Sequence, residues 1–234
     1  MTGTPLALHV VVPAHDEAEL VGACLDSVSE SAARLRAVVG LPVTVTVVAD
    51  SCTDSTVEVA DRHGADVIQV DVRGVGMARD VGVRHVLAAS GIPDPSRVWI
   101  AMTDADSTVP VTWLESQVRS ASRGFDLVVG RVHPDPVDVS PVVLREWSAR
   151  HRAPGELHVH GANLGFTAAT FRRAGGFPAI AEHEDVEFVR AAVAAGSTWT
   201  SSGPAVRTSA RLLGRTPGGF AGYVRLLVAE LEQA

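Results

Sequence analysis

The stretch Trp99-Ile100-Ala101-Met102-Thr103-Asp104-Ala105-Asp106-Ser107 decides how this chain folds. Its apolar start predicts a buried strand, and two aspartates follow at spacing i, i+2. Residues two apart on an extended chain point the same way, so both carboxylates can face one site where the strand ends. In an α/β sheet that edge binds ligands, and paired carboxylates suit Mg²⁺ or Mn²⁺. The alternative is a helix N-cap in front of Pro110.

Strand and helix patterns alternate through the first half of the chain. Apolar runs rich in β-branched residues predict strands at 6–12, 43–49, 67–70, 98–103 and 126–132. Helical periodicity between them predicts helices at 17–39, 54–64, 75–89 and 110–122. Strict alternation of this kind favours a parallel sheet with helices on both faces, as in Rossmann-like βαβ units.

The second half of the chain is less regular. Proline-rich loops separate helices that we expect at 142–150, 167–174, 184–195 and 218–232. No repeat and no clear linker divides the sequence. We therefore expect one α/β domain over 1–234, with a nucleotide-binding half at 1–133 and a smaller, mixed, acceptor-side half at 134–234.

Composition narrows the class of protein. The 234 residues are 46% hydrophobic, which is enough for a well-packed core, and the net charge of −7 argues against non-specific nucleic-acid binding. All 20 cationic residues are arginines, so no mechanism can use a lysine Schiff base. No apolar run reaches the ~18 residues of a membrane span, and no signal peptide pattern is visible. We expect a cytoplasmic protein, with peripheral contact with a membrane left open.

Three further turns carry polar groups where a strand meets a helix. Backbone at Pro13, followed by Glu17, could receive a base or ribose. Asp50 ends an apolar strand, where a carboxylate can accept the N3–H of a pyrimidine or the hydroxyls of a ribose. Arg79 lies in the first turn of a helix after Arg73-Gly74-Val75-Gly76, and its guanidinium could reach a base or phosphate. Each pattern is also typical of a helix cap or a tight turn.

The fifth site is His183-Glu184-Asp185, directly before a helix. Acidic residues in a first turn complement the helix dipole, which alone would explain them. A carboxylate at this place could instead act as a general base. The two glycines before Arg79 lack the third glycine of the dinucleotide fingerprint, which argues against a Rossmann oxidoreductase.

In their order and spacing, these five sites resemble glycosyltransferase family 2, which has the GT-A fold. VVVPAHDEAEL is similar to the family's PAYNEE turn, VVADSCTDST to VVDDGSTDGT, GVGMARDVGVRHV to its G-x-x-x-ARN-x-G helix start, and TDADS to its DxD metal motif. GANLGFTAATFRRAGGF followed by EHEDVEF resembles its G-x-N-x-x-F-R…GGF…EDxDL block. The resemblance covers about residues 8–196. Departures at Ala49, His15-Asp16 and Asp80 leave the identity of the nucleotide open.

The resemblance implies a role for each matched donor-side residue. Asp50 and Arg79 would hold the base of a nucleotide, uracil-like by analogy. Backbone near Pro13 and the side chain of Glu17 would lie against the nucleoside. The donor would accordingly be a nucleotide-sugar, with a UDP-sugar as the first expectation.

The remaining matched residues would carry the chemistry. By resemblance, Asp104 would touch the ribose or the metal shell, and Asp106 would bind the Mg²⁺ or Mn²⁺ ion that bridges the diphosphate. Asp185 would be the general base, with Glu184 beside it and Asn163 in the acceptor loop. The implied activity is metal-dependent transfer of a hexose to an acceptor hydroxyl with inversion at the anomeric carbon.

The acceptor side offers fewer signals. Trp147, His151, His158 and His160 could line an acceptor pocket, and Arg211 could fold over the diphosphate. The acceptor itself, whether a small molecule, a glycan or a lipid-linked molecule, stays open. Two alternatives remain: a nucleotidyltransferase, which also uses paired aspartates, and a non-catalytic module that only binds a sugar nucleotide.

Overall fold

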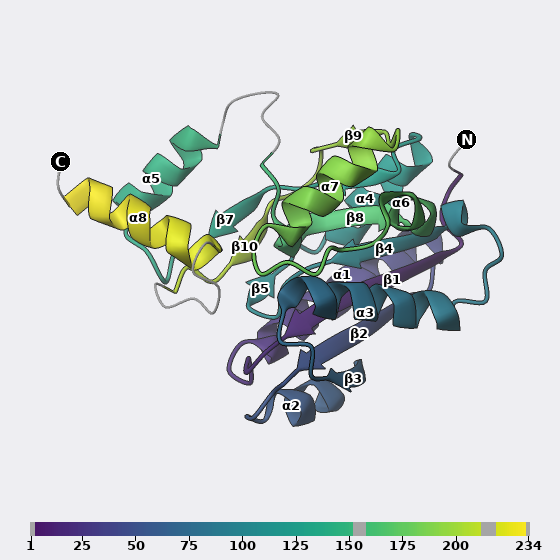
Figure 1. The fold of residues 1–234 in the computed structure, drawn as a ribbon, viewed down its shortest axis with the longest axis horizontal. Coiled ribbons are helices and arrows are strands. Elements are labelled where there is room, and N and C mark those ends of the chain that lie inside the picture. Colours follow the sequence, from purple (N-terminus) through teal and green to yellow (C-terminus); the bar gives the residue numbers. More distant parts are fainter. Residues whose placement is uncertain (1–2, 152–157, 212–218, 233–234) are drawn as a thin grey trace.

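The computed structural model describes residues 3–151, 158–211 and 219–232 (Figure 1). Its strands are β1 (Ala7–Ala14), β2 (Val43–Asp50), β3 (Asp66–Val70), β4 (Val98–Met102), β5 (Ser107–Thr108), β6 (Leu127–Val129), β7 (Val132–Pro134), β8 (Leu164–Thr167), β9 (Trp199–Thr200) and β10 (Val206–Thr208). Its helices are α1 (Val21–Val39), α2 (Thr56–Arg62), α3 (Val75–Ala89), α4 (Trp113–Ser122), α5 (Pro141–Arg150), α6 (Ala168–Ala174), α7 (Glu184–Ala194) and α8 (Phe220–Glu232). Two 3-10 turns, η1 (Pro95–Arg97) and η2 (Gly161–Asn163), complete the described elements.

The main sheet has seven strands in the order β3-β2-β1-β4-β8-β6-β9. Strands β3, β2, β1 and β4 run parallel, as the alternating sequence pattern predicts. Alternate residues of β1 face opposite layers: Val10 and Val12 pack in the core with α1 and α4, whereas Val11 packs in the core with α3. Helices therefore cover both faces of the sheet (Figure 1).

The sheet is mostly parallel, as expected, and the sequence did not predict its antiparallel strand β8. This strand lies between β4 and β6 and runs antiparallel to both. It contains only four residues, Leu164–Thr167, too few for a period-two pattern to stand out in the sequence. The run expected as one strand at 126–132 is divided into β6 and β7 at Gly130, and β7 joins a second sheet of order β5-β10-β7.

The second sheet begins where β4 ends. After Met102 the chain turns through residues 103–106 into β5, which pairs antiparallel with β10. The paired aspartates therefore occupy the turn that joins the two sheets. Helix α5 packs against β7 and α8, beside each other at one end of the molecule (Figure 1). Among the described residues, none of the helices has the length and apolarity that crossing a bilayer requires.

Candidate functional site

One cavity of about 1100 Å³ lies at the carboxyl ends of β1, β2 and β4. The side chains that the sequence singles out come from five separate segments, and all of them line this cavity: Pro13, Glu17, Asp50, Arg79, Asp104, Asp106, Glu184 and Asp185. They meet because parallel strands end at the same edge of a sheet. The helix-cap alternative for the two aspartates is excluded, since α4 begins after Thr112.

Asp104 and Asp106 have different surroundings in this turn. Asp104 Oδ1 accepts a hydrogen bond of 2.6 Å from Arg79 Nη2. Asp106 is more deeply buried, and its Oδ1 accepts from the hydroxyl of Thr208 at 3.3 Å. Burial, and then the charge of Asp104, raises the pKa of Asp106 to about 6, although Arg211 acts in the opposite direction. A bound cation would therefore favour the ionised form of this carboxyl. The contact with Thr208 could not be foreseen from the sequence, because Thr208 lies on β10, a strand that the sequence pattern did not predict.

Arg211 bridges Asp106 and Glu17. Its Nη2 atom lies 2.5 Å from Glu17 Oε1 and 3.1 Å from Asp106 Oδ2. Its Nη1 atom donates to Glu17 Oε2 at 2.9 Å. Carboxylate oxygens from two segments of the chain therefore converge on one positive charge, the Arg211 guanidinium. Such hard oxygen donors are those that Mg²⁺ and Mn²⁺ prefer, so the residues present fit a divalent cation.

Arg79 is buried between two other acids. Nη2 binds Asp104, and Nη1 donates to Glu184 in the first turn of α7. Burial raises the pKa of Glu184, and the Arg79 charge opposes that rise. The guanidinium thus joins α3, the β4–β5 turn and α7. The family resemblance implies that Arg79 contacts the base of a nucleotide. In the structure its guanidinium contacts these two carboxylates.

Asp50 holds the loop that precedes α3. The backbone N–H groups of Val72, Arg73 and Gly74 each donate to its carboxylate at 2.9 Å. Burial pushes the pKa of Asp50 upward, but these three bonds outweigh it and hold the pKa below its usual range. Asp50 is therefore a fixed negative charge in the cavity wall. Oδ2 accepts only one of these three bonds, from Gly74, which leaves it capacity for a ligand N–H.

Asp185 is half-buried at the start of α7. Its Oδ2 accepts from the Gly161 N–H at 2.7 Å, and its Oδ1 accepts from the Val186 N–H at 2.8 Å. These bonds fix the orientation of a carboxylate that lines the cavity. Asn163, expected in the acceptor loop, is instead buried, where it accepts from the indole N–H of Trp113 at 2.9 Å. Its side-chain amide also donates to the carbonyls of Arg131 and Pro204.

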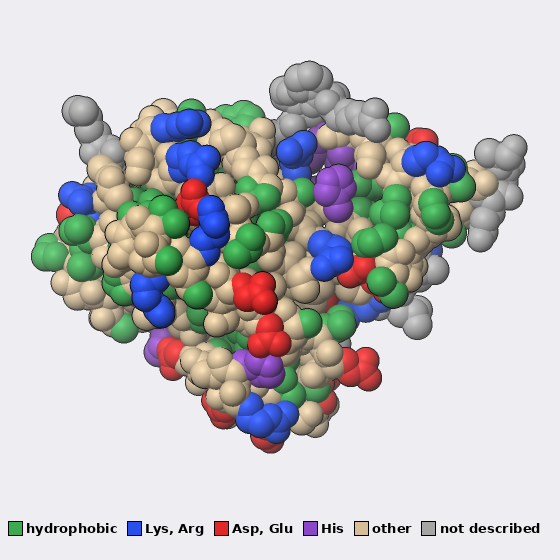
Figure 2. Space-filling model, turned by 180° about the vertical axis from the view of Figure 1, so that it is seen from behind, with side chains coloured by type: hydrophobic (Ala, Val, Ile, Leu, Met, Phe, Trp, Pro, Cys, Tyr) green, Lys and Arg blue, Asp and Glu red, His purple; other side chains and the backbone are tan. Residues whose placement is uncertain are grey.

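Aromatic and imidazole rings form the other wall. The Trp147 and His151 rings stack at 3.8 Å, and His160, Phe220 and Tyr223 lie around the same indole. His158 also lines the cavity, as do His151 and His160. Trp147 itself is fully buried and donates its indole N–H to the carbonyl of Val132. It therefore belongs to the hydrophobic core as well as to the cavity wall. Histidine side chains reach the surface on the α5–α8 side of the molecule (Figure 2).

The Asp80 departure noted in the sequence has a structural explanation. Its carboxylate pairs with Arg84 at 2.5 Å and accepts the N–H of Phe177 at 3.0 Å. Asp80 therefore fixes the Gly-Gly-Phe turn after α6. Asp80 is not among the residues that line the cavity, so its charge does not face that space.

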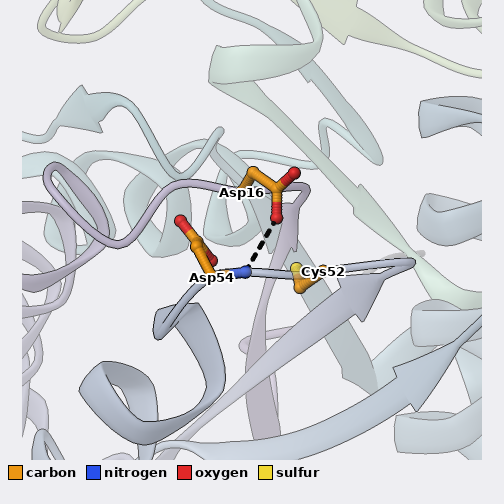
Figure 3. Close-up of side chains that lie close together, drawn as sticks. All are labelled: Asp16, Cys52 and Asp54. Carbon is orange, nitrogen blue, oxygen red and sulfur yellow. Dashed lines mark hydrogen bonds between the residues drawn. The ribbon is translucent and has the colours of Figure 1, made fainter.

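A second group of potential ligands lies outside this cavity. One atom each from Asp16, Cys52 and Asp54 lie within 4.8 Å of one another (Figure 3). Asp16 accepts the N–H groups of Thr53 and Asp54 at 2.6 and 3.2 Å, and Asp54 accepts the N–H of Thr56 at 2.9 Å. These hydrogen bonds hold the turn before α2, which accounts for the proximity of the two carboxylates.

Comparisons with known proteins identify the family of this chain. The model of the family described as glycosyl transferase family 2 matches residues 9–175. Two mycobacterial proteins, the uncharacterized glycosyltransferases Rv0539 of Mycobacterium tuberculosis and Mb0553 of Mycobacterium bovis, are 34% identical over 128 residues, which is 55% of this chain. The aligned part is 50% of their length, so the chain spans about half of these relatives.

Solved structures share the fold at low sequence identity. The mannosyltransferase PcManGT of Pyrobaculum calidifontis, in complex with GDP-Man and Mn²⁺, has a TM-score of 0.65 at 19% identity, over 98% of this chain and 65% of its own. TarS 1–349 of S. aureus gives 0.63 at 16%, over 97% and 66%. Glucosyl-3-phosphoglycerate synthase of M. tuberculosis, with Mn²⁺, UDP and phosphoglyceric acid, gives 0.57 at 19%, over 96% and 78%. These neighbours have the GT-A fold, and the family match extends over most of the chain: the chain belongs to glycosyltransferase family 2.

Proposed function

We propose that this protein transfers a sugar from a nucleotide-sugar to an acceptor hydroxyl, with a divalent cation at the diphosphate. The observation that carries the proposal is the convergence of Glu17 and Asp106 oxygens on one positive charge, in the cavity that Asp185 also lines. A net charge of −7 provides no general attraction for an anionic donor, so a local cation is needed.

The donor would lie along the carboxyl edge of the parallel strands. Asp50 Oδ2 is our candidate for the N–H of a base, and the backbone at Pro13 lies at the same edge. Two of the structural neighbours were solved with GDP-Man or UDP together with Mn²⁺, which supports a nucleoside diphosphate here without choosing the base. We retain a UDP-sugar as the first donor to test. For Arg79, buried contacts with Asp104 and Glu184 favour a positioning role.

In the proposed reaction, the acceptor oxygen attacks the anomeric carbon from the face opposite the diphosphate. The bond from that carbon to the diphosphate oxygen breaks, and its electron pair leaves with the nucleoside diphosphate. A divalent cation held by Asp106, with Glu17 or Asp104, would neutralise the charge that develops there. Asp185 would accept the proton of the acceptor hydroxyl, and a single displacement of this kind inverts the anomeric centre.

Nucleotide binding with and without metal tests the proposal. UDP, GDP, TDP and NAD are each added with Mn²⁺ or with EDTA, and the melting temperature is recorded. A ligand at 100 times its Kd adds about 2.7 kcal/mol to the free energy of unfolding. We expect one nucleoside diphosphate to stabilise the protein with Mn²⁺ and much less with EDTA.

Variants connect that result to the site. Asp106→Asn should abolish the Mn²⁺ dependence, whereas Asp61→Asn, an exposed aspartate on α2, should retain it. If the nucleotide stabilised the protein equally with Mn²⁺ and with EDTA, the metal assignment would be wrong. It would also be wrong if Asp106→Asn retained the Mn²⁺ dependence of the wild type. Donor binding without release of nucleoside diphosphate for any acceptor would favour the non-catalytic alternative, and NAD binding alone would favour an oxidoreductase.

A further inference from the structure

Two arginines contact the carboxylates of the cavity, and they differ in exposure to solvent. The Arg79 side chain is 5% exposed, and Arg211 is 32% exposed. A Cβ at Gly161 would overlap the Arg79 guanidinium, so the backbone closes over that side chain. Arg211 has an open side toward the cavity. Arg79 is therefore built into the wall, whereas Arg211 can leave its partners by rotation about its own side-chain bonds.

The backbone before Arg211 is anchored. Thr208 belongs to β10, and Asp138 accepts both the Ser209 hydroxyl at 3.0 Å and the Ala210 N–H at 2.7 Å. A change in the position of the Arg211 guanidinium therefore requires no movement of β10. The side chain alone can exchange one set of anionic partners for another.

The partners of Arg211 are the carboxylates that fit a divalent cation. A guanidinium and a divalent cation cannot both occupy the point between Glu17 Oε1 and Asp106 Oδ2, because one nitrogen already lies 2.5 and 3.1 Å from these atoms. Cation binding to these two oxygens must therefore break two or more charge-assisted hydrogen bonds of Arg211. Once released, the guanidinium remains beside a cavity whose proposed ligand carries two phosphates, and its fork geometry suits phosphate.

We propose that Arg211 is an exchangeable counter-cation of this site. Its guanidinium neutralises the Glu17–Asp106 pair in the ligand-free protein, yields that place to the divalent cation, and then pairs with the phosphates of the bound nucleotide. The inference rests on the proposed function, since it requires the cation and the nucleoside diphosphate to bind here. Its consequence is cooperative binding: Arg211 opposes the cation alone and supports the cation together with the nucleotide.

Mn²⁺ binding by Arg211→Gln tests this exchange, measured by calorimetry or by the EPR signal of free Mn²⁺. Without nucleotide, the variant should bind Mn²⁺ at least about tenfold more tightly than the wild type, because even one charge-assisted hydrogen bond is worth about that factor and cation binding breaks two or more. With saturating UDP or GDP, whichever binds, the variant should bind Mn²⁺ more weakly than the wild type. Arg207→Gln is the control, since Arg207 lies on β10, pairs with Asp135 at 3.6 Å and lies outside the cavity.

Arg211→Lys covers the case in which the neutral variant is too unstable to study. It keeps the charge but loses the fork, so its Mn²⁺ affinity without nucleotide should lie between those of the wild type and Arg211→Gln. Unchanged or weaker Mn²⁺ binding by Arg211→Gln in the absence of nucleotide overturns the exchange, provided that the wild type binds Mn²⁺ through Asp106. If the wild type binds no Mn²⁺ with or without nucleotide, both the exchange and the metal part of the proposed function are wrong.

Discussion

The guanidinium of Arg79 lies against the backbone of Gly161, so closely that a Cβ at position 161 would overlap it. The N–H of the same glycine donates to Asp185 at 2.7 Å. One residue of the η2 turn therefore contacts both the arginine that joins Asp104 to Glu184 and the proposed general base. Only a residue without a side chain permits this approach.

Gly161→Ala should consequently disturb both groups. Overpacking of this kind typically lowers the free energy of unfolding by about 1–3 kcal/mol, and the displaced Arg79 should also reduce sugar transfer. Urea unfolding and nucleoside diphosphate release measure the two effects. Gly3→Ala is a matched control, because its Cβ would also face an arginine, but at 3.4 Å from the flexible Arg97 guanidinium. Wild-type stability and turnover in Gly161→Ala would contradict the contact.

Removal of the Arg79 guanidinium should be more damaging than loss of an exposed ion pair. Arg79→Ala would leave Glu184 buried without its charged partner, and breaking a buried pair in this way typically lowers the free energy of unfolding by about 3–5 kcal/mol. Arg190→Ala, on α7, removes an arginine whose side chain is 67% exposed and whose partner Glu187 is 47% exposed, so its effect should stay below about 1 kcal/mol. Equal losses in the two variants would show that Arg79 is not a buried link.

The assignment of Asp185 as the general base predicts a specific kinetic loss. Asp185→Asn retains an oxygen for the Gly161 N–H but cannot take up a proton, so kcat should fall about 10²–10⁴-fold, or about 3–5 kcal/mol of activation energy. Donor Kd should change little, because our proposal gives the donor contacts with Asp50, Pro13 and the divalent cation and none with Asp185. Glu187→Gln, an exposed residue on the same helix, serves as the control. Turnover of Asp185→Asn at the wild-type rate would remove Asp185 from this role.

Motif order predicted the location of the site because each motif follows an apolar run or begins a helix. Parallel strands bring their carboxyl ends to one edge, so a local pattern such as that of Asp50 or Asp106 is enough to place a side chain there. The same reasoning correctly predicted that the first four long strands run parallel, with helices on both faces of the sheet, although it did not predict their order.

Side-chain pairing within the site could not be predicted in this way. Arg211 and Glu17 are 194 positions apart, and Arg79 and Glu184 are 105 positions apart, so no local pattern connects them. From the sequence we therefore expect Arg79 to contact the nucleotide base and Arg211 to contact the diphosphate. In the ligand-free protein both arginines instead form ion pairs with carboxylates. Strand β8 was missed because its four residues are too short to display a period.

His160 gives the fold a pH dependence that is independent of the acids. Burial, and then the nearby His151 and His158, lowers the pKa of His160 from 6.5 to about 3. The unfolded chain therefore binds a proton below pH 6.5 that the folded chain does not bind. Because the unfolded state binds more protons, the stability due to this residue is present above pH 6.5 and is lost as the pH falls toward 3.

Replacement of this imidazole isolates its contribution. His160→Phe keeps an aromatic ring beside Trp147 and Phe220 and removes the titrating group. Between pH 6.5 and 4.5, the free energy of unfolding of the wild type should fall by about 1.4 kcal/mol per pH unit more than that of the variant, as measured by urea unfolding at each pH. His85→Gln replaces a histidine that is 40% exposed and should leave the wild-type slope nearly unchanged. Parallel pH profiles for the wild type and His160→Phe would mean that His160 is protonated in the folded protein and that the cavity wall it forms is open to water.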